Sequence, residues 1–308
     1  MSAIEVTVIM PAYNVGPHLL PAVQSILDQT FQDFELLLID DGSTDGSTVT
    51  ISKIDDARIR IVKNEHNIGI INTRNKGIAL ARGSLLAMLD GDDIAKPERL
   101  AKQVATFRAN PQLALLGTAA DLIDGEGRVF DMVLVPPTTA EIKKKIVRGN
   151  VFIQSSIMMR KDAVMDLGGY STEFPVAEDY ALWLKFAEKY EVANLNERLT
   201  QYRVHAGQIS QTKIKLMREM ANKVQEQAWL SIVDKGLENE FSPPIKPSLR
   251  KRLRARENTL GKDYMVWVNY YRKMGNRPAA IKTALSGLRV APLSTDLFKK
   301  LLITLFNR

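Results

Sequence analysis

Two groups of carboxylates lie at positions in the sequence where they could do chemistry. The first is D-G-D-D at 90–93, which places three carboxylates within four residues directly after the apolar run L-L-A-M-L. The second is the pair Glu178 and Asp179, which opens an apolar helical pattern in A-E-D-Y-A-L-W. Carboxylates that crowd together repel one another, so keeping all three of the first group ionised at the end of a buried strand requires a compensating positive charge.

A divalent cation would supply that charge. Mg²⁺ and Mn²⁺ prefer oxygen ligands, and a cation bound by one or two protein carboxylates completes its shell with substrate phosphate. Gly91 fits this interpretation, because a residue without a Cβ atom lets a ligand approach the backbone closely. The alternative is a turn with a helix cap, in which Asp93 forms local hydrogen bonds ahead of Pro97. Because other polar loops are expected beside them, the three carboxylates favour a metal and phosphate site over this alternative.

The elements that must position these groups alternate between strand and helix. Short apolar runs lie at 6–10, 35–40, 59–62 and 85–89, and segments with helical spacing separate them. Near-continuous apolar strands between helices predict a doubly wound α/β domain with a mainly parallel sheet. Ligands bind at the carboxyl ends of the strands in such a sheet, and each of the four runs is followed by a polar loop. These loops are P-A-Y-N, D-D-G-S-T-D, N-E-H-N-I-G and D-G-D-D.

The composition is that of an ordinary globular protein without disulfides. The 308 residues are 45% hydrophobic and 25% charged, and none is cysteine. No apolar stretch reaches the length of a membrane span, and the N-terminus lacks the basic start and cleavage site of a signal peptide, so we expect a cytoplasmic protein. Much of the net charge of +7 follows residue 213, for example in R-K-R-L-R-A-R at 250–256. This charge indicates either an anionic partner surface or a solvated helical face.

Six motifs, in this order, resemble glycosyltransferase family 2. They are P-A-Y-N at 11–14, F-E-L-L-L-I-D-D-G-S-T-D at 34–45, N-I-G-I-I-N-T-R-N-K-G at 67–77, D-G-D-D at 90–93, G-G-Y at 168–170 and A-E-D-Y-A-L-W at 177–183. The resemblance implies the GT-A fold and a metal-dependent, inverting transfer of a sugar from a nucleotide-diphosphate donor, typically a UDP-sugar. The acceptor would be a saccharide or a lipid-linked sugar, as in the synthesis of cell-surface polysaccharides and glycoconjugates.

The resemblance also implies which residues bind the nucleotide. Pro11, Ala12 and Tyr13 would line its pocket, and Asp41 would accept a hydrogen bond from the base, typically uracil.

Further roles follow from the motifs around the fourth strand. Arg74 would help to hold the nucleotide, Asp90 would contact the ribose and Gly91 would lie against the nucleotide-sugar. Asp92 would bind Mn²⁺ or Mg²⁺ at the diphosphate. His205 is similar to a family histidine that approaches the metal or the diphosphate, and its alternative is a solvated loop histidine.

Asp179 matches the family's general base. Inverting transfer needs one carboxylate to take the proton of the acceptor hydroxyl as its oxygen attacks the anomeric carbon. A metal can stabilise the charge that develops on the leaving diphosphate. The alternative for Glu178 and Asp179 is favourable charge in the first turn of a helix, worth about 0.3–1 kcal/mol. Together with the other motifs, the pair favours the base.

We predict a catalytic GT-A domain at 1–212 and a basic helical C-terminal region at 213–308. Within the first, about 1–100 would bind the nucleotide-sugar and about 101–212 would form the acceptor side. The last helical stretch places six apolar side chains on one side, namely Leu297, Phe298, Leu301, Leu302, Leu305 and Phe306. Such a helix can lie on an anionic membrane surface, which would make the protein peripheral at the inner face of the cell membrane. Alternatively, it packs against the catalytic domain or against a twin subunit in a homo-oligomer.

Two other functions fit parts of the sequence. A sugar nucleotidyltransferase also combines an α/β sheet with acidic metal ligands, but it would carry a glycine-rich, basic loop after the first strand, and P-A-Y-N-V-G is neither. A basic nucleic-acid-binding protein would account for the tail but not for the acidic loops. We therefore expect a glycosyltransferase that does not bind nucleic acid.

Overall fold

The computed structural model describes residues 4–204, 213–244, 264–265, 267–273, 275–290 and 294–306. The chain divides into two compact units, Met1–Pro244 and Ile245–Arg308. His205 and the basic stretch 250–256 lie outside the described residues.

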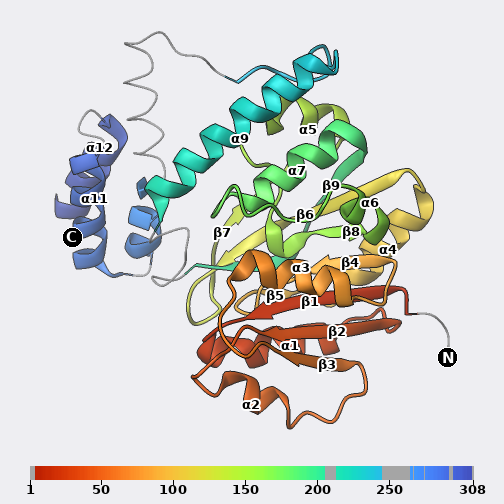
Figure 1. Ribbon diagram of the computed structural model, residues 1–308. Helices are drawn as coiled ribbons and strands as arrows, with labels where there is room; N and C mark the ends of the chain where they lie inside the picture. The colour runs from red at the N-terminus through yellow and green to blue at the C-terminus, as the bar shows by residue number, and fades with distance from the viewer. Residues whose placement is uncertain are drawn as a thin grey trace. The chain divides into compact units, whose positions relative to one another are not determined.

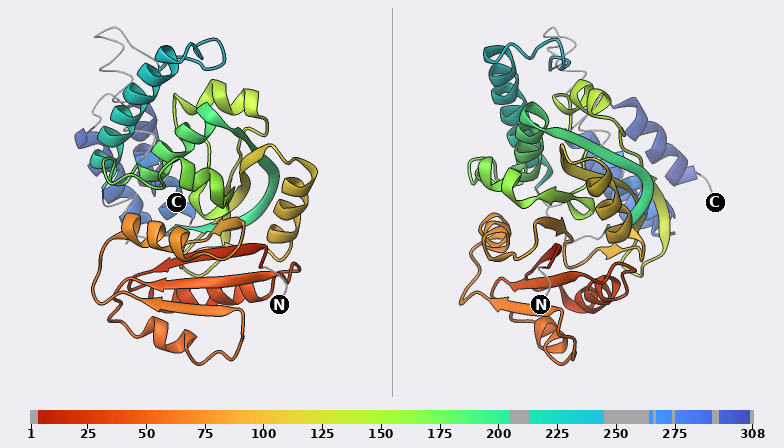
Figure 2. Two further views of the ribbon diagram at one scale, coloured as in Figure 1. Left: turned by 45° about the vertical axis from the view of Figure 1, so that its right-hand side comes forward. Right: turned by 90° about the vertical axis from the view of Figure 1, so that its right-hand side faces the viewer.

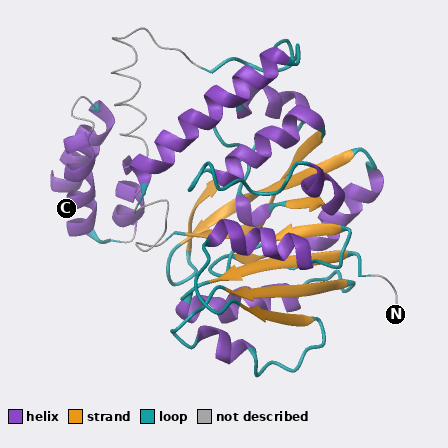
Figure 3. Cartoon of the chain, viewed as in Figure 1, coloured by secondary structure: helices purple, strands orange, loops and turns teal. Residues whose placement is uncertain are grey.

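The first unit is built on one nine-stranded sheet (Figures 1 and 3). Its strands are β1 (Val6–Ala12), β2 (Phe34–Asp40), β3 (Ile59–Lys63), β4 (Leu85–Met88), β5 (Ile94–Ala95), β6 (Leu113–Ile123), β7 (Val129–Val133), β8 (Met158–Arg160) and β9 (Glu191–Arg203). The strand order is β3-β2-β1-β4-β8-β6-β9-β5, and β7 pairs with β6. The first four strands are mutually parallel, as predicted, whereas β8 joins β4 and β6 in antiparallel pairs.

Helices cover both faces of this sheet, as the two turned views in Figure 2 show. They are α1 (Leu19–Leu27), α2 (Ser47–Ile51), α3 (Ile70–Leu80), α4 (Arg99–Ala109), α5 (Thr139–Ile146), α6 (Lys161–Asp166), α7 (Glu178–Lys189) and α9 (Ile214–Asp234), with short 3-10 turns η1 (Gly16–His18) and η2 (Gln154–Ser156). Successive strand residues point to opposite faces, so Val8 and Leu36 pack with α1, α2 and α4. Ile9 and Leu37 pack with the other helices. Burial of both faces explains why the strands are almost continuously apolar.

The strand order places a topological switch between β1 and β4. From β1 the chain continues to β2 and β3 on one side and returns to β4 on the other. The loops after β1 and β4 therefore flank the crevice in which open α/β sheets bind ligands. This arrangement confirms the predicted α/β class and places the P-A-Y-N and D-G-D-D loops on the same edge.

The first unit extends beyond the predicted boundary at residue 212. Helix α9 packs on α7, and its buried residues Met220, Val224, Ala228 and Ile232 join the cluster that contains Trp183. Glu240, which follows α9 in the chain, forms an ion pair with Lys143 of α5 at 2.5 Å. Helix α9 belongs to the mostly helical, basic stretch that was expected to form the C-terminal region, yet its apolar stripe is covered by the first unit.

The second unit contains a helical pair, α11 (Arg277–Val290) and α12 (Thr295–Phe306). Its core includes Ala284 from α11 and Leu297 and Leu301 from α12. Two residues of the predicted apolar stripe are therefore internal, whereas Phe298, Leu302 and Leu305 remain 38–54% exposed. None of the helices in the described ranges is long and apolar enough to span a membrane.

Candidate active site

Cross-loop hydrogen bonds join the loops after β1 and β2 into one wall. The backbone N–H of Thr44 donates to Asn14 Oδ1 at 2.8 Å, and the N–H of Asn14 donates to Ser43 Oγ at 3.1 Å. The N–H of Gly16 donates to Asp45 Oδ2 at 2.8 Å. Asn14 has φ 48°, a left-handed conformation that asparagine tolerates better than most residues. Neither motif indicates these pairings, although both loops are expected at the site.

The three residues assigned to the nucleotide pocket differ in exposure. Pro11 and Ala12 are buried at the end of β1, and the carbonyl of Ala12 accepts a hydrogen bond from the N–H of Asp41 at 2.8 Å. The side chain of Tyr13 is 50% exposed. Of the three, Tyr13 is therefore the one whose side chain is open to a ligand.

Asp41 is buried and organises the loop that leads into α3. Its carboxylate accepts hydrogen bonds from Asn64 Nδ2 at 2.8 Å, from the N–H of Ile68 at 2.9 Å and from the N–H of Gly69 at 3.0 Å. An ionised carboxylate has about four acceptor positions, so these three donors leave one of them unused. Asp41 thus has a structural role beside the one that the resemblance implies.

The three carboxylates of D-G-D-D have different surroundings. Both oxygens of Asp90 accept from Nη2 of Arg74, at 3.0 and 3.1 Å. Asp93 points inward and accepts from the N–H of Arg203 at 2.7 Å; burial, together with the nearby Asp92 and Asp90, raises its pKa well above the usual range. Asp92 is partly buried, and its carbonyl accepts from Arg203 Nε at 2.7 Å. Arg74 therefore offsets the negative charge of Asp90, and burial disfavours the ionised form of Asp93. A metal ion is not needed to compensate all three carboxylates.

Within the described residues, no group of three or more His, Asp and Glu side chains is placed to hold a metal ion. A cation that shares substrate phosphate needs only one or two protein carboxylates, and the carboxylate of Asp92 is a suitable oxygen ligand. His205 lies outside the described residues, so its predicted role stays a prediction.

The packing of the protein itself also favours glycine at position 91. A Cβ atom at this position would lie 3.1 Å from Leu19 Cδ1, 3.3 Å from Val15 Cγ2 and 3.4 Å from the carbonyl oxygen of Pro11. The missing side chain therefore makes room for the protein itself, because the loop after β4 packs closely on the loop after β1.

Arg74 connects the end of β4 with the start of α7. Its Nη1 donates to Glu178 Oε1 at 2.8 Å, while Nη2 binds Asp90. The guanidinium carbon lies 5.6 Å from the centre of the Tyr170 ring. Burial would lower the pKa of Arg74, but Asp90, Tyr170 and Glu178 raise it, so the side chain remains charged. One buried cation thereby holds two acidic motifs together.

The G-G-Y motif supports the same network. Gly169 has φ 70°, and a Cβ atom there would lie 2.6 Å from Asn75 Oδ1. This close approach lets the side chain of Asn75 bond both the N–H and the carbonyl of Tyr170, at 2.9 and 2.8 Å. The hydroxyl of Tyr170 in turn accepts from Gln154 Nε2 at 2.9 Å. The motif thus fixes the aromatic ring beside Arg74.

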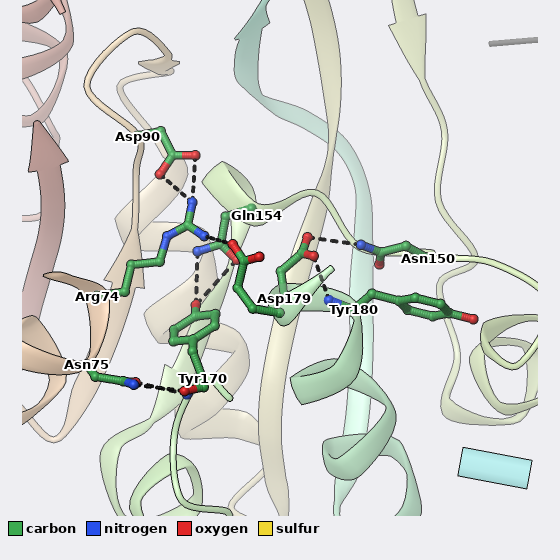
Figure 4. A network of polar contacts seen from close by, with 9 residues as sticks. Arg74, Asn75, Asp90, Asn150, Gln154, Tyr170, Asp179 and Tyr180 are labelled. Atoms are coloured by element: carbon green, nitrogen blue, oxygen red, sulfur yellow. Dashed lines mark hydrogen bonds and ion pairs between the residues drawn. The ribbon is translucent and has the colours of Figure 1, made fainter. Parts of the chain in front are cut away.

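Asp179 lies in the first turn of α7, close to this network (Figure 4). Its Oδ1 accepts from the N–H of Tyr180 at 2.6 Å, and its Oδ2 accepts from Asn150 Nδ2 at 3.1 Å. Burial and the neighbouring Glu178 raise the pKa of Asp179 to about 6, against the opposing effects of Arg74 and the two hydrogen bonds. A carboxylate that titrates near neutral pH suits a general base. Asn150 belongs to no motif, and the sequence offered no signal for it.

Figure 4 shows how these residues lie together: Arg74, Gln154 and Asp179 are grouped between Asp90 on one side and Asn150 on the other. The predicted residues Arg74, Asp90 and Asp179 are therefore brought to one place. Glu178 is not only a favourable charge in a helix's first turn, because it forms a buried ion pair.

Comparisons with known proteins show which family the chain resembles. A family model described as Glycosyl transferase family 2 matches residues 7–168, which is more than half of the chain. The O-antigen biosynthesis glycosyltransferase WbnJ of Escherichia coli is 32% identical over 210 residues, which cover 65% of this chain and 80% of that protein. The UDP-Glc:alpha-D-GlcNAc-diphosphoundecaprenol beta-1,3-glucosyltransferase WfaP of Escherichia coli is 30% identical over 220 residues, which cover 70% and 84%.

A solved structure shares the fold. The crystal structure of S. aureus TarS 1-349 in complex with UDP-GlcNAc matches with a TM-score of 0.59 at 17% sequence identity, over 92% of this chain and 91% of that one. At this identity the match shows the GT-A architecture alone. Because the family model covers more than half of its residues and relatives above 30% identity extend the match, the chain belongs to glycosyltransferase family 2.

Proposed function

We propose that this glycosyltransferase moves a sugar, with inversion, from a UDP-linked donor to a hydroxyl of a saccharide or lipid-linked acceptor in cell-surface polysaccharide synthesis. The relatives support this proposal by their names, which specify O-antigen synthesis and transfer from UDP-Glc to a diphosphoundecaprenol-linked sugar. Family membership also sets aside a nucleotidyltransferase and a nucleic-acid-binding protein as its main function.

The observation that carries the proposal is the bridge made by Arg74. Its contacts with Asp90 and Glu178 bring the loop at the sheet edge next to the helix that carries Asp179. A donor in the crevice between β1 and β4 would then have its sugar close to a carboxylate on the acceptor side.

Asp179 would act as the general base. With a pKa of about 6 it is mostly ionised at neutral pH, yet basic enough to take a proton as the acceptor oxygen becomes nucleophilic. The acceptor oxygen forms the new bond to the anomeric carbon, the bond to the diphosphate breaks, and UDP leaves with the electron pair. Asn150 and the N–H of Tyr180 orient the two oxygens of the base.

The donor would be held by the loops at the sheet edge. Tyr13 offers an exposed ring against which the uracil could stack. Asp41 would accept a hydrogen bond from the N–H of the uracil at the acceptor position that its three protein donors leave unused. Asp92 would hold Mg²⁺ or Mn²⁺, which when bound would neutralise charge on the diphosphate. Asp90, paired with Arg74, would accept from the ribose hydroxyls.

The second unit would place the enzyme at an anionic membrane surface. Phe298, Leu302 and Leu305 are exposed on α12, where Lys299 and Lys300 lie beside them in sequence. Apolar and basic side chains together are typical of interfacial helices.

A ligand-binding panel tests the donor assignment. We would measure thermal shifts with UDP, GDP, CDP and dTDP and with their sugar derivatives, each with Mn²⁺ and with EDTA. We expect stabilisation by UDP and a UDP-sugar that depends on Mn²⁺, and Asp179→Asn should keep this binding but lose transfer. Equal stabilisation in EDTA would contradict the metal assignment, and a preference for another base would contradict the donor assignment.

A further inference from the structure

Lys76 and Asn64 form a chain of hydrogen bonds that ends on Asp41, and neither is among the residues that would contact the donor. Lys76 Nζ donates to Asn64 Oδ1 at 2.6 Å, and Asn64 Nδ2 donates to Asp41 Oδ1 at 2.8 Å. Asp41 follows β2, Asn64 follows β3, and Lys76 belongs to α3. Asn64 is only 4% exposed, so water competes little for its amide.

The backbone brings these side chains together. The N–H of Asn64 donates to the carbonyl of Asp40 at 2.8 Å, which extends the pairing of β3 with β2 by one residue. Helix α3 lies close to the sheet, because a Cβ atom at Gly77 would lie 2.5 Å from Ile9 Cγ2. The missing side chain of Gly77 therefore allows the neighbouring Lys76 to approach the end of β3.

Lys76 determines which way the amide of Asn64 points. The oxygen and the nitrogen of an asparagine amide can exchange places by rotation, and their neighbours decide which arrangement is favoured. A lysine ammonium only donates, so it selects the arrangement with Oδ1 toward Lys76 and Nδ2 toward Asp41. The backbone N–H groups of Ile68 and Gly69 also donate to Asp41. All three groups therefore present hydrogen to the carboxylate.

These donors leave one position open on one oxygen of Asp41. Oδ1 accepts from two of them and Oδ2 from one, so the unused acceptor position is on Oδ2. Uracil and thymine carry a hydrogen on the ring nitrogen N3, whereas cytosine has a bare nitrogen there, which is itself an acceptor. Two acceptors would then face each other without a hydrogen between them. Asp41 is 3% exposed, and unpaired polar groups are costly in such surroundings.

We infer that Lys76 and Asn64 are positioning residues that set the base selectivity of the donor site. By keeping Asp41 an obligate acceptor, they favour a nucleotide with hydrogen on N3 over a cytosine nucleotide. Lys76 acts through Asn64, so it needs no contact with the ligand. This inference rests on the proposed function, because it explains how the same site distinguishes its base. A role in folding alone would change stability without changing the ratio of the affinities for two nucleotides.

The test measures the dissociation constants of UDP and CDP by calorimetry, with the full-length protein in saturating Mn²⁺. The ratio of the two constants reports the preference for the base, because both nucleotides carry the same ribose and diphosphate. Changes in the charge around the diphosphate therefore cancel in this ratio. We expect the unmodified protein to bind UDP at least about tenfold more tightly than CDP.

Lys76→Glu reverses the hydrogen-bonding character of the group that faces Asn64. A glutamate carboxylate only accepts, so the amide would turn Nδ2 toward it and Oδ1 toward Asp41, an arrangement that requires a proton between the two oxygens. A protonated Asp41 can donate to N3 of cytosine, so the preference for UDP should fall at least about tenfold. Lys76→Met, which removes the donor without adding an acceptor, should lower the preference about threefold. Lys76→Arg keeps a donor and should keep the preference within about twofold.

Lys63→Glu is the matched control. Lys63 is exposed at the end of β3 and directly precedes Asn64, so this variant places the same charge near the site, but Lys63 is not the donor to the amide. It should leave the preference for UDP within about twofold.

The inference is overturned if Lys76→Glu retains the preference for UDP, or if Lys63→Glu lowers it as much. An unchanged melting temperature verifies folding of each variant; if Lys76→Glu unfolds, a full preference for UDP in Lys76→Met overturns the inference instead. Failure of the unmodified protein to bind either nucleotide would overturn the proposed function, so the two failures are distinguishable.

Discussion

The guanidinium of Arg74 lies 2.8 Å from the carboxylate of Glu178, although 104 positions separate them in the chain. Both side chains are buried, at 7% and 8% exposure, so water screens their attraction little. Because Asp179 follows Glu178 directly, this ion pair also fixes the position of Asp179 relative to the sheet edge.

Arg74→Met should destabilise the protein strongly, because it leaves Glu178 buried without its cation. Breaking one partner of a buried pair costs about 3–5 kcal/mol in the free energy of unfolding. Urea unfolding of Arg74→Met, Glu178→Gln and the double variant measures this. The double variant should be more stable than Arg74→Met alone; equal stability would show that the carboxylate is not the source of the loss.

The rate of transfer should depend on the protonation of Asp179. Since its pKa is raised to about 6, kcat/KM for the active UDP-sugar should rise with pH up to about 6 and then level off. Asn150→Ala removes a hydrogen bond that favours the ionised form, so this limb should move to higher pH. Asn110→Ala, which removes a similar bond to the exposed Glu191, should leave the profile in place. An unmoved limb in Asn150→Ala would argue against Asp179 as the titrating group.

Asp179→Asn should make the protein more stable at neutral pH while lowering the rate. The pKa of Asp179 is about 6 in the folded protein, whereas the ordinary pKa of an aspartate is 3.8, so folding favours the protonated form and stability falls as pH rises through this window. A neutral amide avoids this loss, and we expect a gain of about 1–2 kcal/mol at pH 7.5 that disappears at pH 4. Transfer should fall by about 10²–10⁴, the contribution of a general base. A gain that persists at pH 4 would point to a cause other than ionisation.

Two adjacent aspartates should respond differently to removal of charge. Asp92→Asn should abolish the Mn²⁺-dependent part of the stabilisation by UDP. Asp93→Asn should preserve it, because burial raises the pKa of Asp93, so the neutral amide resembles the form that burial favours, and an amide oxygen can still accept from the N–H of Arg203. Thermal shifts with UDP, with and without Mn²⁺, measure both. If both variants lose the Mn²⁺-dependent stabilisation, then binding of the cation depends on the conformation of the loop at 90–93 and not on the carboxylate of Asp92 alone.

The C-terminal unit should direct membrane binding through the exposed side of α12. Leu302→Asp should reduce flotation of the protein with vesicles that contain anionic lipid, because it places a charge on the apolar face. Leu230→Asp changes an equally apolar residue, 70% exposed on α9, and serves as the control. If the unmodified protein stays in solution with such vesicles, the membrane assignment is wrong.

The sequence was sufficient for the parts of the fold that depend on local pattern. The apolar runs that became β1 to β4, and the helical spacing between them, predict parallel strands with polar loops at one edge, because a strand buried on both faces must be apolar throughout. The motifs likewise identified Arg74, Asp90 and Asp179, which the structure brings into one network.

Only the tertiary structure decided what each side chain contacts. Nothing local indicates that Asp93 points inward while Asp90 meets Arg74, that Gly91 makes room for Leu19, or that Asn150 reaches Asp179. The apolar stripe of α9 likewise did not reveal that α7 would cover it. Sequence spacing determines which face of an element is apolar, whereas the partner of that face, and the direction of a polar side chain beside it, depend on packing between residues far apart in the chain.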